Sequence, residues 1–134
     1  MKKKLKLLID MLKKRPHLAF AYLFGSRTSG ATNKNSDWDV AVFFSEPPEK
    51  VSRWLAFELE AELSRGMGET VQVVVLNSDL SPVFGFEILK HGLLLLDRDE
   101  NLRINFENRI LRQYYDWQYF LNRQMKAEKG LSRA

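Results

Sequence analysis

The chain has 134 residues, of which 45% are hydrophobic and 28% are charged, and a net charge of +4; these values fit one globular domain over residues 1–134. It contains no cysteine, which excludes disulfides and thiolate metal sites, and its two histidines belong to no zinc-ligand motif. No apolar run approaches the roughly 20 residues that span a bilayer, so we expect a cytoplasmic protein without a membrane segment.

The first half of the chain is predicted to form one helix and two strands. Apolar residues recur at helical spacing from Leu5 to Leu12, which predicts a helix that stops before Pro16. The apolar run 18–24 predicts a buried strand, and residues 37–44 predict a second one. The intervening residues are rich in Gly, Ser, Thr and Asn and therefore predict a loop.

A helix and a third strand are predicted next. Pro47 and Pro48 favour a helix start, because proline is tolerated in the first turn. The helix that follows places Trp54 on its apolar stripe, which predicts a core residue, and is expected to close at Gly66. Residues 71–76 then predict a strand.

The last third completes the predicted domain. Residues 77–79 are expected to cap a short helix that ends at His91, and residues 93–96 predict a fourth strand. A long helix with a hydrophobic stripe begins at about Asp99. The fold class is therefore α/β (α+β): a small mixed sheet of about four strands flanked by helices.

The chemistry is concentrated around the loop between the first two strands. Gly25 allows a tight turn and a close approach to a phosphate, and Ser26 adds a hydroxyl. Asp37 and Asp39 project from the same face of the second strand, since side chains alternate. Two carboxylates held this close repel unless a cation lies between them, and Mg²⁺ prefers such oxygen ligands.

A second Asp-x-Asp provides an internal comparison. Asp97 and Asp99 also follow an apolar strand, with Gly85 at the matching distance upstream. However, Gly85 is followed by Phe86 in place of a hydroxyl residue, and the segment between reads as a helix. We interpret Asp97 as a strand exit and Asp99 as a helix N-terminus, where carboxylates favour the positive end of the dipole.

The spacing of Gly25-Ser26 and Asp37-Trp38-Asp39 resembles the signature of the polymerase-beta-like nucleotidyltransferase superfamily. The short chain resembles its minimal nucleotidyltransferase branch, over its whole length and including Tyr115-Asp116 on the last helix. The resemblance implies a polymerase-beta-like nucleotidyltransferase fold with a long C-terminal helix. It also implies a Mg²⁺-dependent antitoxin that transfers AMP from ATP to a tyrosine of a HEPN-domain ribonuclease toxin and neutralises it.

The same resemblance implies roles for individual residues. Asp37 and Asp39 would be catalytic and would bind the magnesium ions. Arg27 could neutralise triphosphate charge, although loop cations are common, and Ser36 could equally have a structural role as a turn cap. The nucleotide-binding candidates all lie in or beside the loop: Gly25, Ser26, Arg27, Gly30 and Ser36.

One expected carboxylate is absent. The superfamily usually offers a third on the next core strand, where the aligned position is Gln72; Glu69 has the opposite strand parity. A glutamine amide supplies a ligand oxygen but cannot accept a proton. Gln72 could simply be a polar residue at the exposed end of a strand. Two functional interpretations also stay open: an enzyme that takes its base from a partner or the substrate, and a weakened or inactive antitoxin that binds and occludes the toxin.

Other features of the chain are less specific. Transfer to a small molecule such as an aminoglycoside is ranked low, because the chain has little room for a substrate domain. The basic ends read as solvated helix faces, and without a groove motif direct nucleic-acid binding is not expected. Aromatic residues on more than one face of the last helix predict a protein interface: Tyr114, Tyr115, Trp117, Tyr119 and Phe120.

Overall fold

The computed structural model describes residues 2–25, 28, 37–45 and 53–132. Four strands form one sheet in the order β3-β2-β1-β4. β1 pairs antiparallel with both β2 and β4, whereas β2 and β3 are parallel, so the predicted small mixed sheet is confirmed. The strands are β1 (Leu18–Phe24), β2 (Trp38–Phe44), β3 (Val71–Val75) and β4 (Leu93–Asp97).

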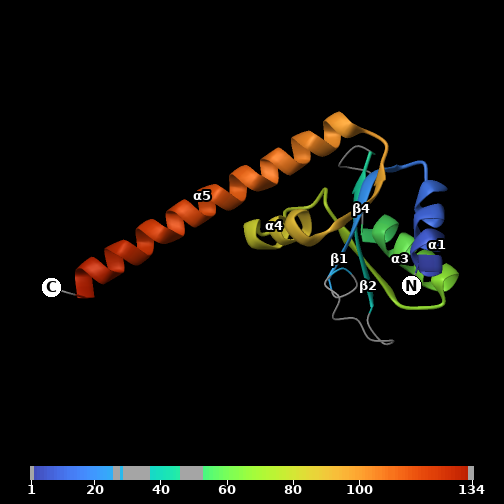
Figure 1. Cartoon of the computed structure of the whole chain (residues 1–134), viewed down its shortest axis with the longest axis horizontal. Helices are drawn as coiled ribbons and strands as arrows, with labels where there is room; N and C mark the ends of the chain where they lie inside the picture. The colour runs from blue at the N-terminus through green and yellow to red at the C-terminus, as the bar shows by residue number, and fades with distance from the viewer. Residues whose placement is uncertain (1, 26–27, 29–36, 46–52, 133–134) are drawn as a thin grey trace.

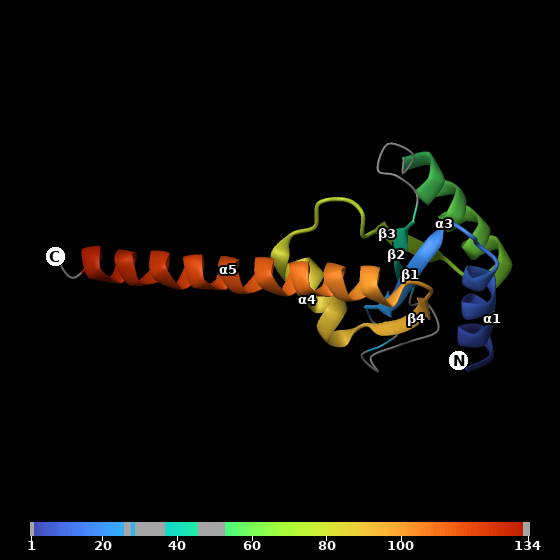
Figure 2. The ribbon, with the colours of Figure 1, turned by 90° about the horizontal axis from the view of Figure 1, so that it is seen from above.

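Helices cover both faces of the sheet and make three layers (Figure 1). Two of them, α1 (Lys2–Lys13) and α3 (Arg53–Met67), pack on one face. The opposite face is covered by α4 (Pro82–His91) and the start of α5 (Glu100–Ser132), which lie beside each other in Figure 2. None of the helices within the described residues is long and apolar enough to cross a membrane.

Alternation along β2 divides its side chains between two cores. Trp38, Val40 and Val42 are buried against α1 and α3. Ala41 packs on the other side with residues of α4 and α5. Asp39 shares the parity of Ala41, so its side chain lies on the α4/α5 face of the sheet.

The first turns of α5 are fixed to the sheet by apolar and polar contacts. Phe106 and Ile110 are buried in the core under α5. The Tyr22 hydroxyl donates to Glu107 Oε2 at 2.5 Å, and Arg103 bridges Glu107 and Asp97 at 2.8 and 2.7 Å. Burial raises the pKa of Tyr22, and the hydrogen bond to Glu107 raises it further. Beyond these turns α5 extends away from the domain (Figure 1).

The structure corrects several helix boundaries. α3 runs past Gly66 to Met67, and Gly68, with φ +67°, follows its end; Gly66 instead packs against Met11. The N-cap of α4 is Ser81, whose Oγ accepts from the Phe84 N–H at 3.2 Å, and not residues 77–79. The predicted helix start at Pro47 and Pro48 lies outside the described residues.

Two strands also differ slightly from the prediction, and one motif is confirmed. β3 ends at Val75, and β4 continues to Asp97. Asp97 closes β4 in an ion pair with Arg103, and Asp99 Oδ1 accepts from the Leu102 N–H at 3.1 Å at the start of α5. The second Asp-x-Asp is therefore a strand exit and a helix N-cap, as expected from its context.

The prediction that Trp54 is a core residue is wrong. Its side chain is 69% exposed, whereas Leu59 and Leu63 on the same helix are buried. Successive helical residues are turned by about 100°, and this offset leaves Trp54 outside the stripe that faces the sheet.

Replacing this exposed side chain should therefore have little effect on folding. We expect Trp54→Ala to change the free energy of unfolding by less than about 0.5 kcal/mol. Leu63→Ala on the same helix should cost about 2–5 kcal/mol, because Leu63 is 1% exposed. Urea denaturation of both variants measures the difference, and a Trp54→Ala loss as large as that of Leu63→Ala would contradict the assignment.

Candidate functional site

The turn that follows β1 and the polar residues at the start of β2 and β3 meet at one edge of the sheet. β1 ends at this edge, and the parallel strands β2 and β3 begin there, at the lower end of the sheet in Figure 1. In the strand register Asp39 lies between Phe24 of β1 and Gln72 of β3. Residues paired in register point to the same face, so Gln72 and Asp39 lie side by side, on the α4 side of the sheet.

The glutamine also contacts the other aspartate. Gln72 Nε2 donates to Asp37 Oδ2 at 3.1 Å. The side chain predicted to occupy the third-carboxylate position is thus adjacent to both Asp37 and Asp39. Glu69 is directed elsewhere: it accepts from Trp38 Nε1 and pairs with Lys4 at 2.8 Å, on the side of the sheet that α1 covers.

The electrostatics of the edge favour a bound cation. Burial raises the pKa of Asp39, and the neighbouring charge of Asp37 raises it further. Both effects make the doubly ionised pair unfavourable, and a divalent ion between the carboxylates would remove that penalty. The donor set consists of carboxylate and amide oxygens, which suits a hard cation such as Mg²⁺. No cluster of three or more His, Cys, Asp or Glu in the described part of the chain is arranged to hold a metal.

Position 25 requires glycine for two reasons: its backbone conformation and the lack of space for a side chain. Its φ of +80° lies in the left-handed region, and a Cβ added there would lie 2.4 Å from Asp39 Oδ2. Thr28 fixes the turn, because its N–H and its Oγ1 both donate to the Gly25 carbonyl, at 3.1 and 2.7 Å. Thr28 is not among the predicted site residues; a hydroxyl residue shortly after a turn glycine is the feature of the sequence that indicates it.

Four of the predicted nucleotide-binding residues are not among those that the structure describes. Ser26, Arg27, Gly30 and Ser36 lie outside the described residues. Their roles therefore stay predictions. Of the predicted site residues, the structure brings Gly25, Asp37, Asp39 and Gln72 together.

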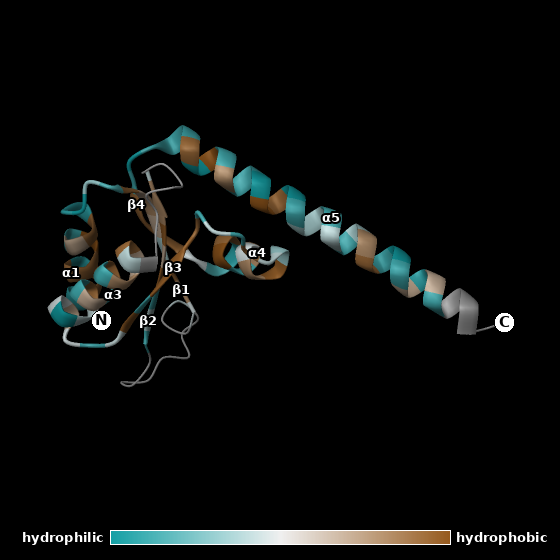
Figure 3. Ribbon diagram, turned by 180° about the vertical axis from the view of Figure 1, so that it is seen from behind, coloured by the Kyte–Doolittle hydropathy of each residue, from teal (hydrophilic) through white to brown (hydrophobic). Residues whose placement is uncertain are grey.

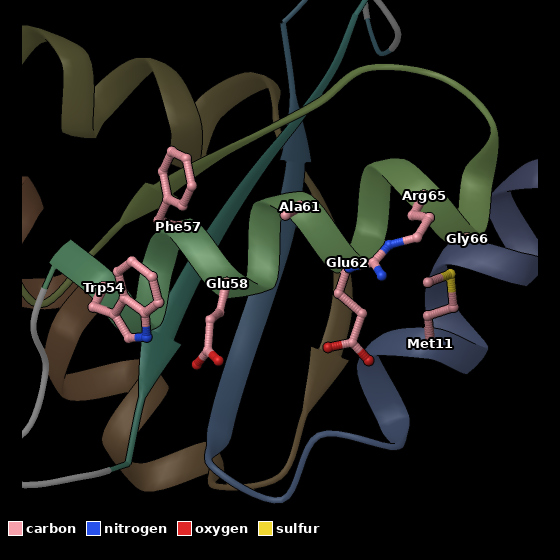
Figure 4. A pocket seen from close by; sticks show the side chains of 8 residues that line it. All are labelled: Met11, Trp54, Phe57, Glu58, Ala61, Glu62, Arg65 and Gly66. Carbon is pink, nitrogen blue, oxygen red and sulfur yellow. The ribbon is translucent and has the colours of Figure 1, made fainter.

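A separate hollow of about 600 Å³ lies on α3 (Figure 4). Trp54 and Phe57 line it with their rings near each other, at a centroid distance of 6.3 Å. One of its acidic residues, Glu62, already pairs with Arg15. The hollow is on the helix that covers the opposite face from Asp39, so it does not belong to the carboxylate site.

Most of the predicted aromatic interface on α5 is accessible. Tyr115, Tyr119 and Phe120 are more than half exposed, and Figure 3 shows hydrophobic and hydrophilic segments alternating along this helix. Tyr114 differs, because it stacks on Phe86 of α4 at 3.8 Å and thus contributes to the domain itself. A protein interface formed by the other four residues of the predicted set stays a prediction.

Comparison with known sequences gives matches over most of the chain. The family described as polymerase beta, nucleotidyltransferase, matches residues 6–101. A protein adenylyltransferase MntA of Aphanizomenon flos-aquae is 30% identical over 112 residues, covering 77% of this chain and 73% of the relative. A protein adenylyltransferase MntA of Shewanella oneidensis is 37% identical over 74 residues, which is 55% of this chain and 49% of that relative. The chain thus spans about half the length of the second of these relatives.

Solved structures share the fold. A toxin-antitoxin crystallised with AMP-PNP superposes with a TM-score of 0.73 at 25% identity, covering 95% of this chain and 98% of that one. A tri-AMPylated Shewanella oneidensis HEPN toxin in complex with MNT antitoxin gives a TM-score of 0.67 at 22% identity, over 95% and 98% of the two chains. These structures share the arrangement of a mixed sheet and a long C-terminal helix.

Proposed function

This chain belongs to the polymerase beta nucleotidyltransferase family, and from that premise we propose that it transfers AMP from ATP to a tyrosine of a HEPN-domain toxin. Transfer would neutralise the toxin, so the chain would act as an antitoxin. Relatives named protein adenylyltransferase and a similar structure with AMP-PNP support the activity. We place this reaction in the cytoplasm and assign it to residues 1–134 as a single minimal nucleotidyltransferase domain.

The observation that carries the proposal is the cluster at the sheet edge. Asp37 and Asp39 lie beside Gln72, which donates to Asp37 at 3.1 Å, and Gly25 leaves room next to Asp39. A turn glycine that meets paired carboxylates suits a ligand carrying both phosphates and a divalent ion. A solvated loop that happened to contain aspartates would not require Gly25 to approach a carboxylate this closely.

The side chains have separate proposed tasks. Asp37 and Asp39 would hold Mg²⁺, which when bound neutralises triphosphate charge and polarises the phosphate under attack. Gly25 lets the backbone approach the phosphates, and Thr28 holds the Gly25 carbonyl in the turn. The remaining phosphate contacts are assigned to Ser26, Arg27, Gly30 and Ser36.

The proposed step replaces the phosphoanhydride bond between the α- and β-phosphates of ATP with a phosphoester bond to the acceptor. The phenolic oxygen of the acceptor tyrosine forms a bond to the α-phosphorus of ATP, the bond to the bridging oxygen breaks, and pyrophosphate leaves. The phenolic proton passes to solvent or to a base on the acceptor, because the neutral Gln72 amide cannot accept it. A phenol, with a pKa of about 10, needs less help than an aliphatic hydroxyl.

Labelled ATP tests the proposal. The chain is incubated with its genomically neighbouring HEPN protein, Mg²⁺ and ATP labelled at the α-phosphate, and the label is mapped to a residue. We expect the label on a tyrosine of the neighbour and its loss when the metal is chelated. Label on neither protein, with both proteins folded, would refute the transferase assignment.

A binding-only antitoxin is the second candidate, and Gln72 favours it. In that case the fold would occlude the toxin without chemistry. Neutralisation of the toxin's RNase activity by the Asp37→Ala, Asp39→Ala double variant distinguishes the two. The binding-only protein would still neutralise, whereas the transferase would lose neutralisation when both carboxylates are removed.

Restoring the missing carboxylate should increase the rate of transfer. Gln72→Asp places a third acidic group next to Asp37 and Asp39, where it can accept a proton and add charge for the metal. We expect transfer to rise by about 100-fold, the lower end of the range for general base catalysis. Initial rates of labelled AMP transfer measure the effect.

Gln72→Asn is the matched control, because asparagine has the size of aspartate without its charge. It should not exceed the wild-type rate. Equal rates for Gln72→Asp and Gln72→Asn would contradict the placement of Gln72 at the third-carboxylate position.

A further inference from the structure

An aromatic ring lies directly beside the carboxylate site. Phe24, the last residue of β1, is the register partner of Asp39 in the antiparallel pair. Side chains paired in this way share a face, with Cβ atoms about 5 Å apart. Phe24 also precedes Gly25 in the chain, so a ligand that contacts the turn and Asp39 would pass this ring.

A second ring continues the surface toward α4. Phe84, in the first turn of α4, meets Phe24 edge-on with ring centroids 5.7 Å apart and an interplanar angle of 89°. Phe84 is 37% exposed, although it belongs to a helix packed on the sheet. Phe24 and Phe84 together form what we call the aromatic shelf.

The position of Phe84 is fixed by the packing of its helix. The Ser81 side chain caps the first turn of α4 through the Phe84 N–H. Gly85 is buried against α5, where an added Cβ would lie 3.0 Å from Ile110 Cγ2. At the other end of the helix a Cβ on Gly92 would come within 3.4 Å of the Leu23 carbonyl oxygen. The accessible face of Phe84 is therefore presented by a rigid element.

We propose that the aromatic shelf is the nucleobase subsite: Phe84, supported by Phe24, stacks on the base of the bound nucleoside triphosphate. This inference rests on the proposed function. The shelf begins beside Asp39, at its register partner Phe24, and continues to Phe84, whose ring centroid lies 5.7 Å from that of Phe24. Its apolar rings suit the flat, weakly hydrated face of a purine.

Stacking has a consequence for selectivity. Every base has a π-face, so a stacking platform holds nucleotides without distinguishing them strongly. We therefore expect ATP and GTP to bind this chain with similar affinity.

The acceptor tyrosine is the other planar ring in the reaction that could occupy the shelf. The nucleobase is preferred because the shelf is continuous with the turn and carboxylate that would hold the same ligand's phosphates.

Two ligands separate the base from the phosphates. Binding of ATP and of inorganic tripolyphosphate, which lacks ribose and base, is measured in Mg²⁺ by calorimetry. Phe84→Ala should weaken ATP binding about tenfold, the effect of losing one stacked base, and leave tripolyphosphate binding unchanged. Phe84→Trp should restore ATP binding. Phe57→Ala is the matched control, because Phe57 is also an exposed phenylalanine but lies on α3.

Each outcome decides the inference. Unchanged ATP binding by Phe84→Ala overturns it, and so does an equal loss for ATP and tripolyphosphate, which would indicate a distorted phosphate site. A change confined to the KM of the acceptor protein also overturns it, because the ring would then hold the acceptor. Wild-type chain that binds no ATP would refute the proposed function, whereas wild-type binding that Phe84→Ala leaves intact refutes the shelf alone.

Discussion

Asp39→Asn is expected to reduce AMP transfer by about 100- to 1,000-fold while the protein stays folded. The substitution preserves shape and removes one of the two charges that would hold the metal, and single groups that stabilise reacting charge contribute about 10²–10³-fold. Transfer of labelled AMP to the acceptor measures the loss. Asp99→Asn is the control, because asparagine is as good an N-cap as aspartate and Asp99 only caps α5.

The same substitution should not reduce stability at neutral pH. Burial and the charge of Asp37 raise the pKa of Asp39 in the folded protein, so ionised Asp39 disfavours the fold once the pH is above that raised value. As the pH falls through the folded pKa toward the unfolded one, the folded protein binds the proton first and the penalty disappears. The melting temperature of Asp39→Asn should therefore equal or exceed that of wild type at pH 7, with the gap narrowing in acid. An active or clearly less stable variant at pH 7 would contradict this account.

Gly25→Ala is expected to lose activity and stability together. Alanine at φ +80° costs about 1–2 kcal/mol in backbone strain, and its Cβ would lie 2.4 Å from Asp39 Oδ2. The carboxylate must then move out of the position in which it faces Asp37 and Gln72. Urea denaturation and AMP transfer should both show the loss, with a free energy decrease of about 2–4 kcal/mol from strain and displacement combined.

Gly68→Ala separates the two causes. Gly68 also has a positive φ, +67°, but among the described residues no atom beyond its chain neighbours lies within 4 Å of the Cβ it would gain. The Gly68→Ala variant should lose only the free energy of backbone strain, about 1–2 kcal/mol, and keep its transfer rate. Equal activity losses at the two glycines would show that the contact with Asp39 is not what makes Gly25 necessary.

Local pattern was sufficient for most of the fold. The apolar runs over β1 and over most of β2 reflect strands that are covered on both faces of the sheet, and such runs are enough to predict both strands. Helix ends were less predictable. Gly66 was chosen as the cap of α3 because it follows a basic residue, but it is needed as a small residue against Met11, and Gly68 ends the helix.

The site was predictable where it depends on strand parity. Asp37 and Asp39 could be placed on one face because side chains alternate along a strand. Gln72 was placed beside them only by the resemblance to the superfamily, because the parallel pairing of β2 and β3 that brings it there is a long-range contact. The prediction that Trp54 is buried failed because the hydropathy pattern fixes the direction of the buried helix face only to within about 100°, the rotation from one residue to the next. Phe84 was not predictable at all, since its proximity to Phe24 depends on how α4 docks on the sheet.

The mass of the HEPN partner after co-expression is the most direct test of the central claim. The partner is purified from cells that co-express either this chain or its Asp37→Ala, Asp39→Ala variant, and its intact mass is measured. We predict a partner heavier by one or more AMP groups with the wild-type chain and an unmodified partner with the double variant. An unmodified partner in both cases, bound and neutralised equally well, would contradict the account.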